Sequence, residues 1–77
     1  MDDKQKRDQA VDCFAAAIKK RLDAKAEQGY TGWDGEYPSL NLISEISCDV
    51  GRICSLAKDY TIDIAARCMM LWYRKQK

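Results

Sequence analysis

The sequence predicts an all-α fold, in which a long N-terminal helix is followed by an aromatic, glycine-rich loop and an antiparallel helical hairpin. Apolar residues recur at spacings of three and four in three stretches, which is the period of one helix face. Three of the four glycines and the only proline lie within residues 29–38. No stretch alternates apolar and polar residues over the length of a strand. The chain has 77 residues, and we expect one domain over 1–77.

The first helix is predicted over about residues 4–28. Its alanines have high helix propensity, and Asp2 and Asp3 lie near its start, as the helix dipole favours. Gly29 is the expected stop, because glycine readily adopts the left-handed conformation that often follows a helix. The apolar stripe of this helix consists of Val11, Phe14, Ile18 and Leu22.

The loop predicted over 29–39 contains three aromatic residues, Tyr30, Trp33 and Tyr37. In one interpretation these rings fold back over a small core, since large aromatic side chains add the most buried area to a small domain. In the other interpretation the loop faces a ligand or a partner. The sequence leaves both interpretations open.

The second helix is predicted over about residues 40–57, with Ser39 as its N-cap. Gly51 lies inside this range, at a cost of roughly 1 kcal/mol in helix propensity. The apolar stripe consists of Ile43, Ile46, Val50, Ile53 and Ala57.

The third helix is predicted over about residues 61–75, after a short turn in which Asp59 or Thr61 can act as N-cap. Its C-terminal end is basic, which the helix dipole favours, so the tail is either a solvated helix end or a contact patch. The apolar stripe is Ile62, Ala65, Ala66, Met69 and Tyr73, and the basic tail is Arg74, Lys75 and Lys77.

The charge balance and the N-terminal segment restrict where the protein works. Thirteen basic and twelve acidic residues leave a net charge of +1, which gives no overall attraction to nucleic acid or to an acidic membrane. The first nine residues are almost all polar and do not resemble a signal peptide. The longest apolar run, 68–73, is far shorter than the roughly 20 residues that span a bilayer. We expect a soluble, cytoplasmic protein.

The four cysteines lie within the apolar helical pattern. They include no Cys-x-x-Cys pair, and the chain has no histidine, so the spacing does not suit zinc. We therefore expect buried free thiols rather than disulfides or metal ligands. The four residues are Cys13, Cys48, Cys54 and Cys68.

Carboxylates on helices are the remaining candidates for chemistry. Without histidine there is no Ser-His-Asp or Cys-His set, and no glycine-rich phosphate loop is present. Glu45 and Asp49 share a helix face, and an antiparallel hairpin can bring Asp63 towards them. Such carboxylates, together with a polyphosphate, can hold Mg²⁺. The alternative is a set of ordinary ion pairs within each helix, with Arg52 and Arg67 as partners.

Residues 14–74 resemble small phage and prophage domains known as dATP/dGTP pyrophosphohydrolases, which are similar to the MazG-like, all-α NTP pyrophosphohydrolases. The resemblance rests on residues 25–29, on Gly-Trp-Asp at 32–34 and, most specifically, on residues 63–72. The last stretch is similar to the family pattern Asp-Val-Ala-Asn-Phe-Ala-Met-Met-Leu. Asp63 matches the acidic residue that the family places on its metal-binding helix.

The resemblance implies a Mg²⁺ site formed by Glu45, Asp49 and Asp63, but the match is incomplete. The superfamily uses Glu-x-x-Glu on one helix and Glu-x-x-Asp on the next. Here Arg52 and Tyr60 stand at two of the acidic positions, with Asp59 as a nearby substitute, and Ala66 replaces the usual asparagine. Arg52 would also place a positive charge beside the cation.

The family resemblance also implies association, because helices from two chains complete one bundle in these proteins. A three-helix chain of this length leaves apolar surface to be covered, so we expect a homo-oligomer, with a dimer favoured. The expected interface residues are Met69, Met70, Trp72 and Tyr73, since one chain cannot bury consecutive positions around a helix.

We expect a small phage-type binding protein on a degenerate pyrophosphohydrolase scaffold, in the host cytosol if the chain is phage-encoded. Its ligand would be a nucleotide or a host protein, such as a component of a defence system. The alternative is an active Mg²⁺-dependent dNTP pyrophosphohydrolase in which Trp33 stacks on the base. Nucleic-acid binding is a third, weaker hypothesis. The expected nucleotide-binding or partner-binding residues are Tyr30, Trp33, Tyr37, Arg52 and Arg67.

Overall fold

The computed structural model describes residues 2–54 and 60–76 of the chain. It contains the helices α1 (Asp3–Glu27), α2 (Ser39–Val50) and α3 (Tyr60–Lys75). The described residues include no strand, so the predicted all-α class is confirmed.

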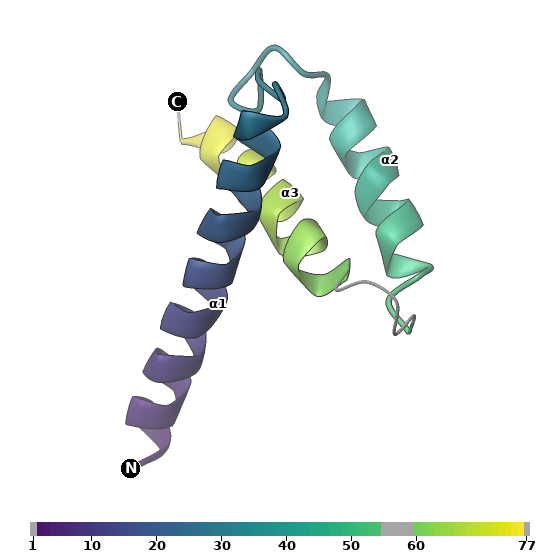
Figure 1. The fold of residues 1–77 in the computed structure, drawn as a ribbon. Helices are drawn as coiled ribbons and strands as arrows, with labels where there is room; N and C mark the ends of the chain where they lie inside the picture. Colours follow the sequence, from purple (N-terminus) through teal and green to yellow (C-terminus); the bar gives the residue numbers. More distant parts are fainter. Residues whose placement is uncertain (1, 55–59, 77) are drawn as a thin grey trace.

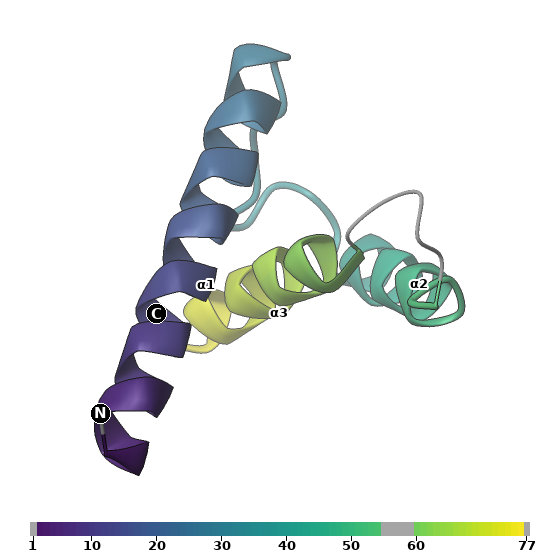
Figure 2. The same ribbon diagram turned by 60° about the horizontal axis from the view of Figure 1, so that its bottom comes forward.

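Helix α3 is the central element of the fold. It packs against both α1 and α2, whereas α1 and α2 do not contact one another. Figure 1 shows α2 and α3 running in opposite directions, as the predicted hairpin requires. Figure 2 shows that α1 crosses α3 at a steep angle and that its N-terminal half extends beyond the other two helices.

Both ends of α1 are fixed by local hydrogen bonds. The Asp2 carboxylate accepts a hydrogen bond from the Gln5 backbone N–H at 2.8 Å, and the Gln5 side chain accepts one from the Asp2 N–H at 3.2 Å. This reciprocal pair is a capping box. At the C-terminal end, Gly29 has φ of +91°. The N–H of Tyr30 then donates to the Lys25 carbonyl, which forms the Schellman turn expected after a helix.

The predicted bounds of α2 are wrong at its C-terminal end. The helix stops at Val50 with Gly51 as its C-cap, and residues 51–54 form turns. The helix therefore ends at glycine, because the residue has low helix propensity, and does not continue through it as predicted. Ser39 is the first helical residue, and no side chain caps the helix, so the predicted N-cap is also wrong.

Helix α3 begins at Tyr60, which places Thr61 inside its first turn rather than at a cap. The other proposed cap, Asp59, lies outside the described residues, as do Ala57 of the second stripe and Lys77 of the tail.

The hydrophobic core is very small. Among the described residues, only Leu42 and Ala66 are buried apolar side chains. Helix α1 buries none of its residues, and Val11 and Phe14 of its predicted stripe are exposed. The four cysteines are free, as predicted, but all are exposed, so the prediction that they are buried is wrong. Because the core is so small, the thiols of the helices and the thiol of Cys54 in the turn after α2 all remain at the surface.

Candidate functional site

Arg67 of α3 connects two acidic side chains of α2. Its Nε donates to Glu45 Oε2 at 3.1 Å, and its Nη1 pairs with Asp49 Oδ2. Asp49 is buried, at 7% exposed, so its charge depends on this partner. Glu45 is the more exposed of the two carboxylates. The guanidinium therefore joins the two helices of the hairpin through charge-assisted hydrogen bonds.

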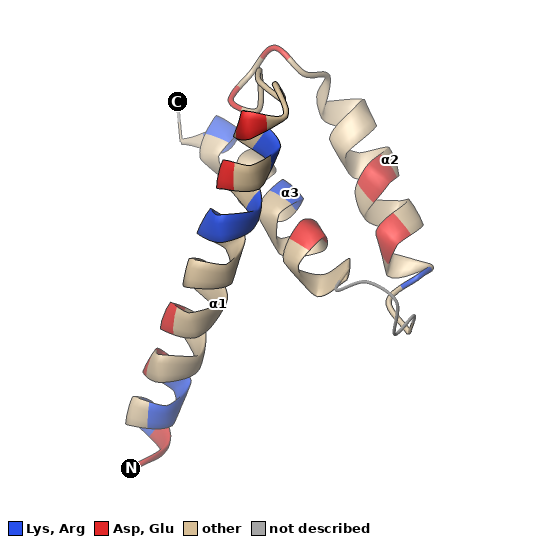
Figure 3. Cartoon of the chain, in the orientation of Figure 1, with Lys and Arg blue, Asp and Glu red and all other residues tan. Residues whose placement is uncertain are grey.

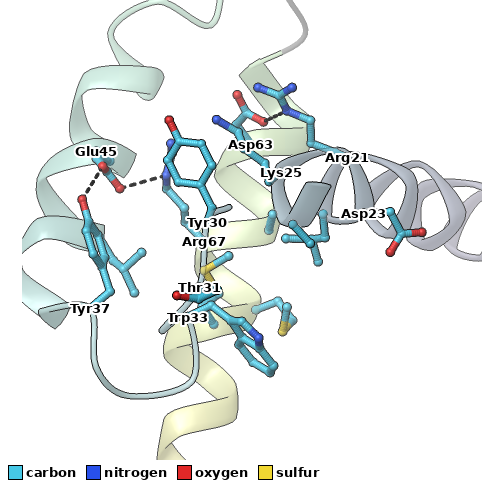
Figure 4. Close-up of a pocket in the computed structure, with 16 residues that line it drawn as sticks. Arg21, Asp23, Lys25, Tyr30, Thr31, Trp33, Tyr37, Glu45, Asp63 and Arg67 are labelled. Carbon is cyan, nitrogen blue, oxygen red and sulfur yellow. Dashed lines mark hydrogen bonds and ion pairs between the residues drawn. The ribbon is translucent and has the colours of Figure 1, made fainter. Parts of the chain in front are cut away.

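Tyr37 extends this cluster into the aromatic loop. Its hydroxyl donates to the second oxygen of Glu45, Oε1, at 2.7 Å. Figure 4 shows Tyr37, Glu45 and Arg67 in a continuous row. The hydrogen bond to Glu45 raises the pKa of Tyr37, because ionisation would remove the donor and place two negative charges together.

The third acidic residue of the predicted metal set faces a different helix. Asp63 is 5% exposed and accepts a hydrogen bond from Arg21 Nε of α1 at 2.9 Å. The interhelical partners of Glu45, Asp49 and Asp63 differ from the intrahelical pairs considered from the sequence. Figure 3 shows acidic residues on α2 and α3, and basic residues on α3 and on the part of α1 that lies beside it.

These contacts bear directly on the implied Mg²⁺ site. Each of the three carboxylates already has an arginine partner, and a guanidinium beside the oxygens repels a divalent cation. Within residues 2–54 and 60–76, no group of three or more His, Cys, Asp or Glu side chains is placed to hold a metal ion. The residues present do not fit the metal.

A pocket of about 380 Å³ lies beside this cluster, where the C-terminal half of α1, the aromatic loop and the hairpin meet. Such a volume is at the lower end of the range for small-molecule sites, about 300–1,000 Å³. Its apolar lining comes mainly from Leu22, Ala26, Leu42, Ala66, Met69 and Met70, and its aromatic lining from Tyr30, Trp33 and Tyr37.

The aromatic loop is held by the C-terminal end of α3. Trp33 packs on Tyr73, with ring centroids 5.0 Å apart and a tilt of 54°. Arg74 donates from Nε and Nη2 to the Trp33 carbonyl, at 3.1 and 2.8 Å, and from Nη1 to Ser39 Oγ at 2.9 Å. Arg74 is thus a structural clamp and not a solvated tail residue. Lys75 is exposed, as a solvated helix end predicts.

Of the five predicted binding residues, four line this pocket and Arg52 does not. Arg52 is exposed after α2 and borders a separate, more polar hollow next to Asp49. Two of the predicted interface residues, Met69 and Met70, line the pocket, whereas Trp72 is 61% exposed.

Two basic pocket residues were missed by the sequence analysis. Arg21 pairs with Asp63, and the Lys25 ammonium lies 4.6 Å from the centroid of the Tyr30 ring. Arg21 lies three positions from Ile18 and four from Lys25, and Lys25 lies three positions from Leu22, so both cations belong to the same face of α1 as the apolar stripe. Two cations within an apolar stripe were therefore a signal that this stripe borders a polar site.

The charged residues around the pocket balance. Three cations and three anions line it, so the local field favours neither sign in a ligand. In the close-up, Asp23 points away from the row of Tyr37, Glu45 and Arg67 (Figure 4). The charged lining residues are Arg21, Lys25 and Arg67 against Asp23, Glu45 and Asp63.

No protein-family model, curated protein or solved structure matches this chain. In the part of the chain that the structure describes, none of the helices combines the length and the apolar character that crossing a membrane requires.

Proposed function

We propose that this chain is a small binding protein and not a metal-dependent hydrolase. The observation that carries the proposal is the pairing of Glu45 and Asp49 with Arg67 and of Asp63 with Arg21. A hydrolase of the implied type needs these carboxylates for Mg²⁺, which polarises phosphoryl oxygens and activates water. Here the same carboxylates serve to hold three helices together. We place the protein in a reducing cytosol, because its four exposed cysteines are free thiols. If the chain is phage-encoded, this is the cytosol of the host cell.

The ligand that suits the pocket best is the base of a nucleotide. Aromatic rings and methionines border a space of about 380 Å³, and flat heterocycles stack on such rings. Because the lining charges balance, phosphate groups add little to binding and remain in solvent at the mouth of the pocket. A deoxynucleoside and its triphosphate are therefore expected to bind with similar affinity, within about threefold.

Fluorescence can test this proposal, because Trp33 lies in the pocket and the other tryptophan, Trp72, does not line it. In a Trp72→Phe background, each of the four deoxynucleosides and dNTPs is titrated with and without Mg²⁺. We expect saturable quenching by at least one base, with little dependence on phosphate number or on Mg²⁺.

Tyr30 provides the test of the binding site, because its side chain is 63% exposed and contributes little to the fold. Tyr30→Leu should weaken binding by roughly 5- to 150-fold, because the loss of one stacking partner costs about 1–3 kcal/mol. Trp72→Leu is the matched control, since Trp72 is 61% exposed and lies outside the pocket. Absence of binding, or equal affinity in Tyr30→Leu, would refute the proposal. Mg²⁺-dependent release of pyrophosphate would instead support the alternative, an active dNTP pyrophosphohydrolase.

A further inference from the structure

Lys25 differs from the other two cations that line the pocket. Arg21 and Arg67 each pair with carboxylates, whereas the Lys25 ammonium lies 4.6 Å from the centroid of the Tyr30 ring. A cation over an aromatic ring is attracted by the electrons of the ring face. The partner of Lys25 is therefore a ring that itself lines the pocket (Figure 4).

The C-terminal end of α1 brings these two side chains together. Gly29 has φ of +91° and turns the chain back, so the Tyr30 N–H donates to the Lys25 carbonyl at 3.2 Å. The Gly29 N–H donates to the Ala26 carbonyl at 3.0 Å, which completes the Schellman turn. In such turns the residue after the glycine commonly packs on the residue whose carbonyl it bonds. The backbone therefore places the Tyr30 side chain on that of Lys25.

The Tyr30 side chain has little else to hold it in place. It is 63% exposed, and its hydroxyl forms no hydrogen bond within residues 2–54 and 60–76. Exposed side chains change rotamer within picoseconds to nanoseconds, and fixing such a side chain on binding lowers affinity. A ring that Lys25 already holds avoids part of this loss.

We propose, on the basis of the base-binding function inferred above, that Lys25 is a positioning residue of the pocket. It holds the Tyr30 ring where the bound base stacks on it. The ammonium lies over one face of the ring, and the base stacks on the other face. Lys25 thus acts through Tyr30 and not on the phosphate groups, in agreement with the balanced charges of the pocket.

Titration with deoxynucleosides and their triphosphates, followed by Trp33 fluorescence in the Trp72→Phe background, tests the proposal. Lys25→Gln removes the charge and keeps a side chain of similar length. It should weaken binding of a deoxynucleoside and of its triphosphate equally, by about two- to fivefold, the strength of an exposed cation–π contact. Lys25→Arg should bind as the wild type does, because a guanidinium also stacks on aromatic rings. Lys20→Gln is the matched control, since Lys20 is exposed on α1 and does not line the pocket.

A double-mutant cycle separates a role through Tyr30 from a direct contact with the ligand. In a Tyr30→Leu background, Lys25→Gln should weaken deoxynucleoside binding no further. Equal losses in both backgrounds, a loss confined to the triphosphate, or unchanged affinity in Lys25→Gln would overturn the role of Lys25 while base binding itself stands. A wild-type protein that binds no base would overturn both proposals.

NMR spectroscopy keeps the test valid if Lys25→Gln fails to fold. Protons above the face of an aromatic ring are shielded by the ring current, so the ε-methylene protons of Lys25 should resonate upfield of those of Lys20. Tyr30→Leu should remove this difference. Lys25 protons at the same position as those of Lys20 in the wild-type protein would overturn the proposal.

Discussion

Replacing Arg67 with methionine removes the guanidinium that connects both acidic residues of α2 to α3. Methionine keeps an unbranched side chain of similar length, so the change is mainly one of charge and hydrogen bonding. It leaves Asp49, with 9% of its side chain exposed, without the ion pair to Arg67. Glu45 keeps the hydrogen bond from Tyr37 and has 39% of its side chain exposed.

The two carboxylates contribute very differently to the expected cost. Removing the partner of a buried charge lowers the free energy of unfolding by about 3–5 kcal/mol. Asp49 is such a buried charge. Glu45 is well hydrated, so its share is below about 1 kcal/mol. We therefore expect Arg67→Met to lower the free energy of unfolding by about 3 kcal/mol at neutral pH. At the usual value per residue, the free energy of unfolding of the whole chain is about 4–12 kcal/mol. A loss of about 3 kcal/mol should lower the Tm by about 12–24 °C.

Thermal and urea unfolding followed by circular dichroism measure this change, at one protein concentration throughout. The double variant Arg67→Met with Asp49→Asn should regain much of the loss, since no buried charge then lacks a partner. Arg7→Met is the control, because Arg7 pairs with Asp3 at the surface and should shift Tm by no more than about 4 °C. A loss below about 1 kcal/mol, or a double variant no more stable than Arg67→Met, would refute the reasoning.

Further predictions concern the loop and its contacts. Gly29→Ala should cost about 1–2 kcal/mol in unfolding experiments because φ is +91° there, whereas Gly35→Ala, which meets open space, should be neutral or slightly stabilising. The Tyr37 phenol should titrate above pH 10 by absorbance at 295 nm, assigned by the Tyr37→Phe difference, and Glu45→Gln should lower that pKa. Because the raised pKa favours the neutral phenol, its contribution to stability is complete below pH 10 and is lost as pH rises further. Arg74→Met should speed amide exchange in the aromatic loop, and unchanged protection would contradict its role as a clamp.

Local patterns in the sequence were sufficient to predict the three helices and most of their ends. The period of the apolar residues predicted three helices, and glycine chemistry placed the end of α1 at Gly29. The end of α2 was missed because two effects compete at Gly51. The apolar period continues to Ile53, but the low helix propensity of glycine prevails and the helix ends at Gly51.

Only part of the candidate site could be predicted from the sequence. The aromatic residues and Arg67 were identified, because three rings within one short loop are a strong local pattern. The ion pairs were assigned to the wrong partners, since residues one turn apart are neighbours on every helix. Which of them actually pair depends on how α1 and α2 are oriented around α3. Arg21, forty-two positions from Asp63, had no local signal for that contact.

The sequence by itself determined the helical class, the approximate elements and the aromatic loop, because these follow from residue type and spacing over a few turns. The tertiary structure alone decided that the three carboxylates pair with arginines of other helices and not with one another. It also decided that α2 exposes an apolar stripe and that all four cysteines lie at the surface. The physical reason is that burial and charge pairing depend on the crossing of helices distant in sequence, which no local pattern specifies.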